Sequence, residues 1–178
     1  MPKTQVAMDF HHEFSVELGR LVAHWAVVES CLSNILSMLI GIQDQVKGKF
    51  IFMTFISLKS KLELIERLTE TFFVESPEKT RLVALLKECI RLNNLRNDNV
   101  HAQWGPSTNK DNLSRWPSSL PNNFKRQIFK EVSEVAVQDI RNVVEQIAEL
   151  SSRLVEFQFD DVPKLQTYEG WPKPPQSR

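Results

Sequence analysis

The amino-acid sequence predicts an all-α protein, a four-helix up-down bundle with a loop-rich insertion between its third and fourth helices. Apolar residues return at steps of three and four along four long stretches, which is the period of amphipathic helices. Gly41, Ser76-Pro77 and Gly105-Pro106 mark breaks between these stretches. The chain has 178 residues, 42% of them hydrophobic, so it is large enough for one core. Because the links between the predicted helices are short, consecutive helices are expected to run antiparallel.

The first predicted helix covers residues 10–40, and no proline interrupts it. Its apolar stripe consists of Phe14, Leu18, Leu21, Trp25, Val28, Leu32, Ile35 and Leu39. Gly41 suits a helix C-cap, and residues 41–48 are typical of a connection. Glu29 lies at the border of the stripe, four residues after Trp25. Its carboxylate has two interpretations, a solvated flank residue or the partner of a buried arginine.

The second and third predicted helices cover residues 49–73 and about 77–103. The second carries Ile51, Phe55, Leu58, Leu62, Ile65, Leu68 and Phe72 on its inner face. Lys59 and Lys61 project from its polar side, either as solvated lysines or as part of a phosphate-binding track. Ser76 is a hydroxyl N-cap and Pro77 fits the first helical position, so the third helix begins there.

The remaining chain divides into an insertion, a fourth helix and a tail. Residues 105–124 are rich in Pro, Ser and Asn, and 124–135 show an imperfect alternation that fits a short strand or hairpin. The helical period returns over residues 137–157. We therefore expect one helical domain over residues 1–159, with the insertion at about 105–135, and a proline-rich C-terminal tail over 160–178.

Composition excludes several classes of function. The net charge is zero, so an anionic ligand needs a local cluster of cations. Cys31 and Cys89 lie in apolar patterns without metal-ligand spacing, and we expect buried thiols in a reducing compartment. No phosphate-binding glycine loop, zinc motif or nucleophile elbow occurs, so no metal site or cofactor is expected. No signal peptide or span-length apolar run was recognised, which favours a cytoplasmic protein without a membrane segment.

The end of the third helix turns polar where its core stripe should continue. The register of Leu82, Leu86 and Cys89 continues onto Asn93 and Arg96. Burying an unpaired amide or guanidinium is costly, so these groups need partners or a cleft. In addition, Asn93, Asn97 and His101 follow one another at i, i+4 and i+8, which puts them on one ridge beside Arg96.

A guanidinium and an imidazole on one helix end suit transfer chemistry at a phosphodiester. Arginine offers a planar fork that matches phosphate oxygens, and histidine exchanges protons near neutral pH. His101 supplies only one of the two proton-transfer roles. A two-fold homodimer would supply the second, because an isologous interface brings each residue close to its symmetry mate.

The segment Arg96-Asn97-Asp98-Asn99-Val100-His101 resembles the signature of the HEPN superfamily, an arginine and a histidine separated by four to six residues near the end of the third helix. Trp25 and Glu29 midway along the first helix, and Trp104 just after the histidine, are similar too. The resemblance covers about residues 14–157, apart from the 105–135 insertion.

This resemblance implies a metal-independent endoribonuclease that acts as a homodimer, commonly a toxin or phage-defence effector with an antitoxin partner. By analogy, the RNA 2′-hydroxyl attacks the adjacent phosphate and leaves a 2′,3′-cyclic phosphate. Arg96 would bind the phosphate, His101 would move the proton, Asn97 would orient one of them, and Glu29 and Asn93 would support the site. The alternative is a non-catalytic module that binds RNA, a nucleotide or a protein, in which Arg96 pairs structurally with Glu29.

Overall fold

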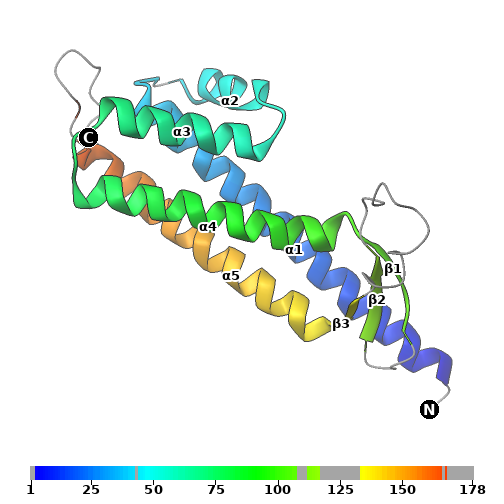
Figure 1. The fold of residues 1–178 in the computed structure, drawn as a ribbon. Helices are drawn as coiled ribbons and strands as arrows, with labels where there is room; N and C mark the ends of the chain where they lie inside the picture. Colours follow the sequence, from blue (N-terminus) through cyan, green and yellow to red (C-terminus); the bar gives the residue numbers. More distant parts are fainter. Residues whose placement is uncertain (1–2, 43, 108–111, 117–132, 166, 168–178) are drawn as a thin grey trace, which may run out of the picture. The chain divides into compact units, whose positions relative to one another are not determined.

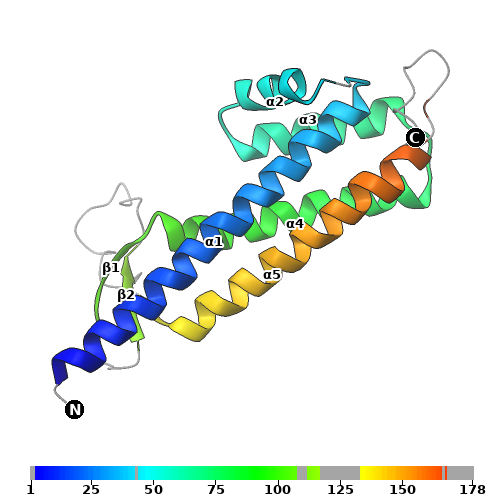
Figure 2. The same ribbon diagram turned by 180° about the vertical axis from the view of Figure 1, so that it is seen from behind.

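The structure of the protein is a computed structural model that describes residues 3–42, 44–107, 112–116, 133–165 and 167. These residues are mostly helical, as predicted, and include one small sheet (Figures 1 and 2). The α-helices are α1 (Lys3–Leu39), α2 (Gln45–Thr54), α3 (Leu58–Phe72), α4 (Pro77–Val100) and α5 (Val137–Glu156), and the strands are β1 (Gln103–Pro106), β2 (Asn112–Trp116) and β3 (Ser133–Ala136).

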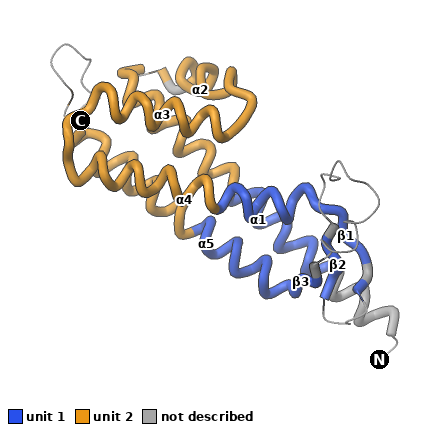
Figure 3. The backbone as a smooth tube through the Cα atoms, in the orientation of Figure 1, with its two compact units in different colours: residues 1–24, 92–148 blue, residues 25–91, 149–178 orange. Residues whose placement is uncertain are grey.

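The chain forms two compact units (Figure 3). Unit 1 consists of residues 1–24 and 92–148, and unit 2 of residues 25–91 and 149–178. The long helices α1, α4 and α5 each contribute residues to both units. The polar end of α4 belongs to unit 1, whereas α2 and α3 belong to unit 2.

Two of the helix ends follow the predicted capping. The amide of Ile42 donates to the carbonyl of Ser37 at 2.8 Å, and Gly41 adopts a φ of 71°, a left-handed conformation that costs glycine little. At the start of α4 the hydroxyl of Ser76 accepts from the amide of Lys79 at 3.1 Å, directly before Pro77. The predicted start and stop signals at these two positions are confirmed.

The second predicted helix, over residues 49–73, is wrong in one respect, because the structure has two helices there. The carboxylate of Asp44 caps the start of α2, accepting from the amide of Val46 at 2.9 Å. Phe55 is extended, with φ −85° and ψ 122°, and the hydroxyl of Ser57 accepts from the amide of Ser60 at 3.1 Å to start α3. The apolar residues keep the same period on both sides of this break. A prediction from periodicity alone therefore gave one helix where the structure has two.

Unit 2 is held together by a core of leucine, isoleucine and phenylalanine side chains and by two clusters of ion pairs. The ammonium of Lys79, whose side chain is 3% exposed, lies 2.9 Å from the carboxylate of Glu70 on α3 and 2.6 Å from that of Glu75. Arg81 on α4 bridges to Glu156 at 3.1 Å and to Asp161 at 2.6 Å. The first cluster joins α3 to α4, and the second joins α4 to the end of α5.

The helical body extends further than predicted at its C-terminal end. A π-helical turn (Phe157–Asp161) and a 3-10 turn (Val162–Lys164) follow α5 directly. Asp161 and Val162 are buried in the protein, whereas the prediction placed them in a tail over residues 160–178. The predicted start of the tail is therefore too early in the sequence. Beyond Leu165, only Thr167 lies within the described residues, where it forms a bridge with Phe73.

The insertion predicted as loop-rich over 105–135 contains a three-stranded antiparallel sheet in the order β1-β2-β3. Trp104 is paired with Arg115, and Leu113 with Val135. The strands pair across residues distant in sequence, which a local pattern does not specify. Residues 117–132, which include most of the predicted hairpin, lie outside the described part.

Within the described residues, His12–Leu39 of α1 is long and apolar enough to cross a membrane by length and composition, and it contains an 18-residue segment with a mean hydropathy of 1.3. Half of that segment is buried in the protein, as in a core helix of a globular fold. The expectation that no span-length apolar run exists is therefore too strict for α1.

Candidate functional site

The predicted site residues on α4 lie in its last two turns, in unit 1. The fully buried stripe of α4 consists of Leu82, Leu85, Leu86, Cys89 and Leu92, and it continues onto Asn99, which is 4% exposed. Asn93, Arg96 and Asn97 are half-buried, and His101 is exposed. The polar substitution of the core stripe therefore falls on Asn99, whereas Arg96 and Asn93 lie at its edge.

Arg96, Asn97 and His101 form one hydrogen-bonded group. The Nη1 atom of Arg96 donates to Oδ1 of Asn97 at 2.9 Å and lies 3.2 Å from Nε2 of His101. The amide of His101 donates to the carbonyl of Asn97 at 3.1 Å, which carries the helical bonding one residue beyond α4. The three side chains that the sequence proposed as catalytic are thus brought together.

The guanidinium of Arg96 is only partly satisfied. Its Nε atom is buried and has no hydrogen-bond partner among the described residues. An unpaired buried donor costs roughly 1–3 kcal/mol. Natural proteins retain such groups mainly where a ligand, an ion or a water completes them, so this donor marks the end of α4 as a place for an acceptor.

Asn99 fixes the helix end beneath this group. Its Nδ2 donates to the carbonyl of Leu95 at 2.7 Å, and its Oδ1 accepts from Nη1 of Arg115 on β2 at 3.2 Å. Its own carbonyl accepts from the indole of Trp104 at 3.0 Å. Asn99 thus ties α4 to both β1 and β2.

Trp104 also connects the sheet to α1. Its ring packs edge-on against Phe14, with the ring centroids 4.5 Å apart. Nearby in the same unit, the buried carboxylate of Glu17 accepts from Nε of Arg141 at 3.0 Å and pairs with Arg20 at 3.0 Å. These contacts attach α1 to β1 and to α5.

Asn99 and Arg115 were not predicted from the sequence. Asn99 follows Leu85 and Leu92 at intervals of seven, so its place on the buried stripe was available from spacing. Arg115 had no local signal, because only the pairing of β1 with β2 brings it to α4.

Two supporting residues remain predictions. Glu29, half-buried on α1, belongs to unit 2, and its support of Arg96 stays a prediction. Asn93 lies one turn before Asn97, and its side chain forms no hydrogen bond to the described residues. Within the same part of the chain, no group of three or more His, Cys, Asp or Glu side chains is placed to hold a metal ion.

Comparisons with models of protein families, with curated proteins and with solved structures find no match to this chain. The interpretation of the site therefore rests on its own chemistry and on the resemblance of its motif.

Proposed function

We propose that the protein is a metal-independent endoribonuclease of HEPN type, with Arg96, Asn97 and His101 as its catalytic group. The observation that carries the proposal is the pairing of Nη1 of Arg96 with Nε2 of His101 at 3.2 Å, on a helix end where the imidazole is exposed. Independence from metal and the homodimer come from the resemblance. The four-helix up-down bundle belongs to this proposal, with α1, α3, α4 and α5 as its long helices.

The reaction uses the two groups in different roles. The guanidinium binds the non-bridging oxygens of the scissile phosphate, where its charge stabilises the transition state. His101 takes the proton of the 2′-hydroxyl, whose oxygen attacks phosphorus. The bond from phosphorus to the 5′-oxygen breaks, that oxygen takes a proton, and the products are a 2′,3′-cyclic phosphate and a 5′-hydroxyl. Asn97 accepts from Arg96 and orients it for this contact.

A second imidazole is needed to protonate the leaving oxygen, and we assign it to His101 of a second copy. In a two-fold dimer two copies of Arg96 and His101 would face one RNA groove. Native mass spectrometry should then show a dimer at working concentration. Mixed dimers of wild-type and His101→Ala chains should lose nearly all cleavage, because such a dimer retains only one imidazole in the groove.

The biological role that follows is a toxin or phage-defence effector in the cytoplasm, silenced by an antitoxin partner. Expression of such an enzyme arrests growth, and His101→Ala relieves the arrest. Growth arrest that persists in His101→Ala would separate toxicity from this site.

A non-catalytic module remains the alternative, and one observation favours it. Nε2 of His101 is already occupied by Arg96, so the pair also serves as a structural contact at a helix C-terminus, where a cation is favoured. In that case the protein binds RNA, a nucleotide or another protein without cleaving it.

The chemistry of the products distinguishes the two functions. Labelled RNA is incubated with the protein in EDTA, the cleavage position is mapped, and the ribose at that position is replaced by 2′-deoxyribose. The proposed mechanism predicts 2′,3′-cyclic phosphate ends with the first substrate and no cleavage of the second. Cleavage at the deoxy position, or products with 5′-phosphate, would rule out attack by the 2′-hydroxyl.

A further inference from the structure

Helix α2 is attached to unit 2 by one narrow face. Gly48 lies so close to α1 that a Cβ built on it would meet Oγ of Ser37 at 1.7 Å. One turn later, the ring of Phe52 is 3% exposed. Gly48 and Phe52 are four residues apart and so share a face. The side chains on its other faces are mostly exposed.

Large apolar side chains occupy the face opposite this attachment. Val46, Phe50 and Met53 follow one another at i, i+4 and i+7 and are 68%, 72% and 67% exposed. Ile56, just after the helix, is 102% exposed. We call these four residues the apolar ridge. Isolated exposed apolar residues are ordinary, but a contiguous set of this size on so short a helix marks an interaction surface.

Lysines flank the ridge on both sides. At 100° per residue, Lys47 and Lys49 lie on opposite borders of the stripe, and α2 contains no Asp or Glu. Residues 44–61 contain four lysines and one carboxylate, that of Asp44, which pairs with Lys47 at 3.7 Å. The ridge is therefore apolar at its centre and basic at its edges.

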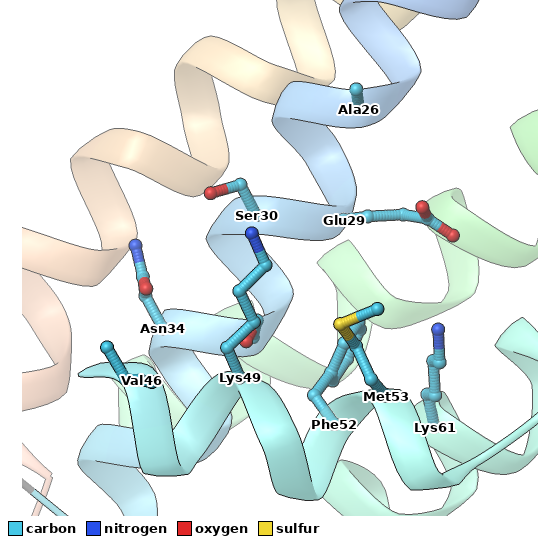
Figure 4. Close-up of a pocket in the computed structure, with 10 residues that line it drawn as sticks. Ala26, Glu29, Ser30, Asn34, Val46, Lys49, Phe52, Met53 and Lys61 are labelled. Carbon is cyan, nitrogen blue, oxygen red and sulfur yellow. The ribbon is translucent and has the colours of Figure 1, made fainter. Parts of the chain in front are cut away.

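A cavity of about 530 Å³ opens beside the ridge, between α1, α2 and α3 of unit 2 (Figure 4). Lys49 extends into it toward Ser30 of α1, and the ammonium group of Lys61 lies on the side of Glu29. Neither lysine forms an ion pair within the described residues, and Lys61 lies 4.4 Å above the ring of Phe52. Glu29 offsets one of the two charges, so the cavity suits a singly charged anionic group.

We propose that the apolar ridge and this cavity bind the surface of an anionic phospholipid bilayer. The ridge enters the boundary between headgroups and acyl chains, the flanking lysines reach the headgroups, and one headgroup phosphate occupies the cavity beside Lys49 and Lys61. This binding is peripheral, lies outside the proposed nuclease function and revises the expectation of a protein without membrane contact.

A protein partner fits the surface less well. A second copy would bring lysines against lysines, because α2 has no carboxylate to face them. A helix of ten residues is about 15 Å long, too short to supply the roughly 800 Å² that each side of a stable interface buries. Val46 and Met53 also line the cavity, whereas Phe50 and Ile56 are exposed, and a lipid surface needs no matching shape.

Vesicle flotation tests the proposal with the full chain. The protein should float with vesicles of phosphatidylcholine and phosphatidylglycerol, stay behind with phosphatidylcholine alone, and be released at about 0.5 M salt, where screening is strong. Phe50→Ser should abolish flotation. The matched control is Phe159→Ser, at a position 64% exposed on the turn after α5, which should float normally. Lys49→Gln should weaken binding about fivefold and Lys87→Gln, on α4, should not.

Several outcomes would overturn the proposal. Equal binding to neutral vesicles, or equal loss in Phe159→Ser, would remove the role of the ridge and its lysines. Vesicle binding that resists salt and persists in Phe50→Ser would mean that the long apolar helix α1 makes the membrane contact, and not the ridge. Absence of vesicle binding together with a self-association that Phe50→Ser abolishes would make the ridge a protein interface. Circular dichroism of each variant checks that it is folded.

Discussion

The Nη1 atom of Arg96 lies 3.2 Å from Nε2 of His101, and this hydrogen bond has only one direction. A guanidinium has no lone pair with which to accept, so the imidazole nitrogen accepts. Nε2 can accept only in the tautomer of His101 that carries its proton on Nδ1. A neutral imidazole beside an arginine is the form that a general base requires, and a phosphate bound by Arg96 would free Nε2 for the 2′-hydroxyl proton.

Removal of the Asn99 amide should destabilise the site more than removal of an exposed amide on the same helix. Asn99→Ala loses the bonds to the Leu95 carbonyl and from Arg115, and we expect a loss of about 1–3 kcal/mol in the free energy of unfolding. Asn94→Ala, at an exposed position of α4, should change it by less than about 0.5 kcal/mol. Urea unfolding followed by circular dichroism measures both. Equal losses would mean that Asn99 does not tie α4 to the sheet.

Two glycines on helices should respond to alanine in opposite directions. Gly19→Ala adds a methyl group that meets nothing within 4 Å, so α1 should gain about 0.5–1 kcal/mol from its lower unfolded-state entropy. Gly48→Ala places a Cβ 1.7 Å from Oγ of Ser37, which forces α2 away from α1 and lowers the melting temperature. Adding Ser37→Gly should restore part of the loss. A melting temperature of Gly48→Ala at or above that of the wild type would contradict the close approach of α2.

The buried lysine of α4 should make unfolding sensitive to alkaline pH. The hydrogen bond to Glu75, aided by Glu70, raises the pKa of Lys79 above 10.5 although its burial opposes this. The stabilisation is complete below the pKa of the unfolded chain and is lost as pH rises through the higher pKa of the folded protein. Lys79→Met should therefore cost about 1–3 kcal/mol at pH 7 and distinctly less near pH 11. Lys87→Met, exposed on the same helix, serves as the control, and a Lys79→Met cost that does not change with pH would contradict the ion cluster.

The thiols should be unreactive until the protein unfolds. Burial raises the pKa of Cys89 from 9.0 to about 12, so at pH 8 its thiolate fraction falls about a thousandfold. Burial raises the pKa of Cys31 as well. Cys31→Ser and Cys89→Ser each leave one thiol to follow. In both variants Ellman's reagent should react with that thiol in urea and scarcely in native buffer. Rapid reaction of native Cys89 would show that the core around α4 is open.

The elements that local chemistry specifies were predictable from the sequence. Ser76-Pro77 marked the start of α4, Gly41 marked the end of α1, and the apolar period located α5 at Val137. The break before Ser57 was missed because the apolar period ignores a hydroxyl N-cap. The sheet was missed because its register depends on pairing between residues distant in sequence.

For the candidate site, the spacing on α4 was enough to group Arg96, Asn97 and His101, since all three lie on one helix. The spacing misplaced the buried position, which is Asn99 and not Asn93 or Arg96. A stripe can drift by part of a turn over five turns of helix, so a stripe extended from Leu82 loses its phase near Val100.

The most direct test of the proposed catalytic group is the single-turnover rate of RNA cleavage in EDTA, measured for wild type, Arg96→Ala, His101→Ala and His24→Ala. We expect a drop of at least about a hundredfold in Arg96→Ala and His101→Ala, and an unchanged rate in His24→Ala, whose imidazole lies on α1. Cleavage that persists in His101→Ala, or that falls equally in His24→Ala, would contradict this proposal.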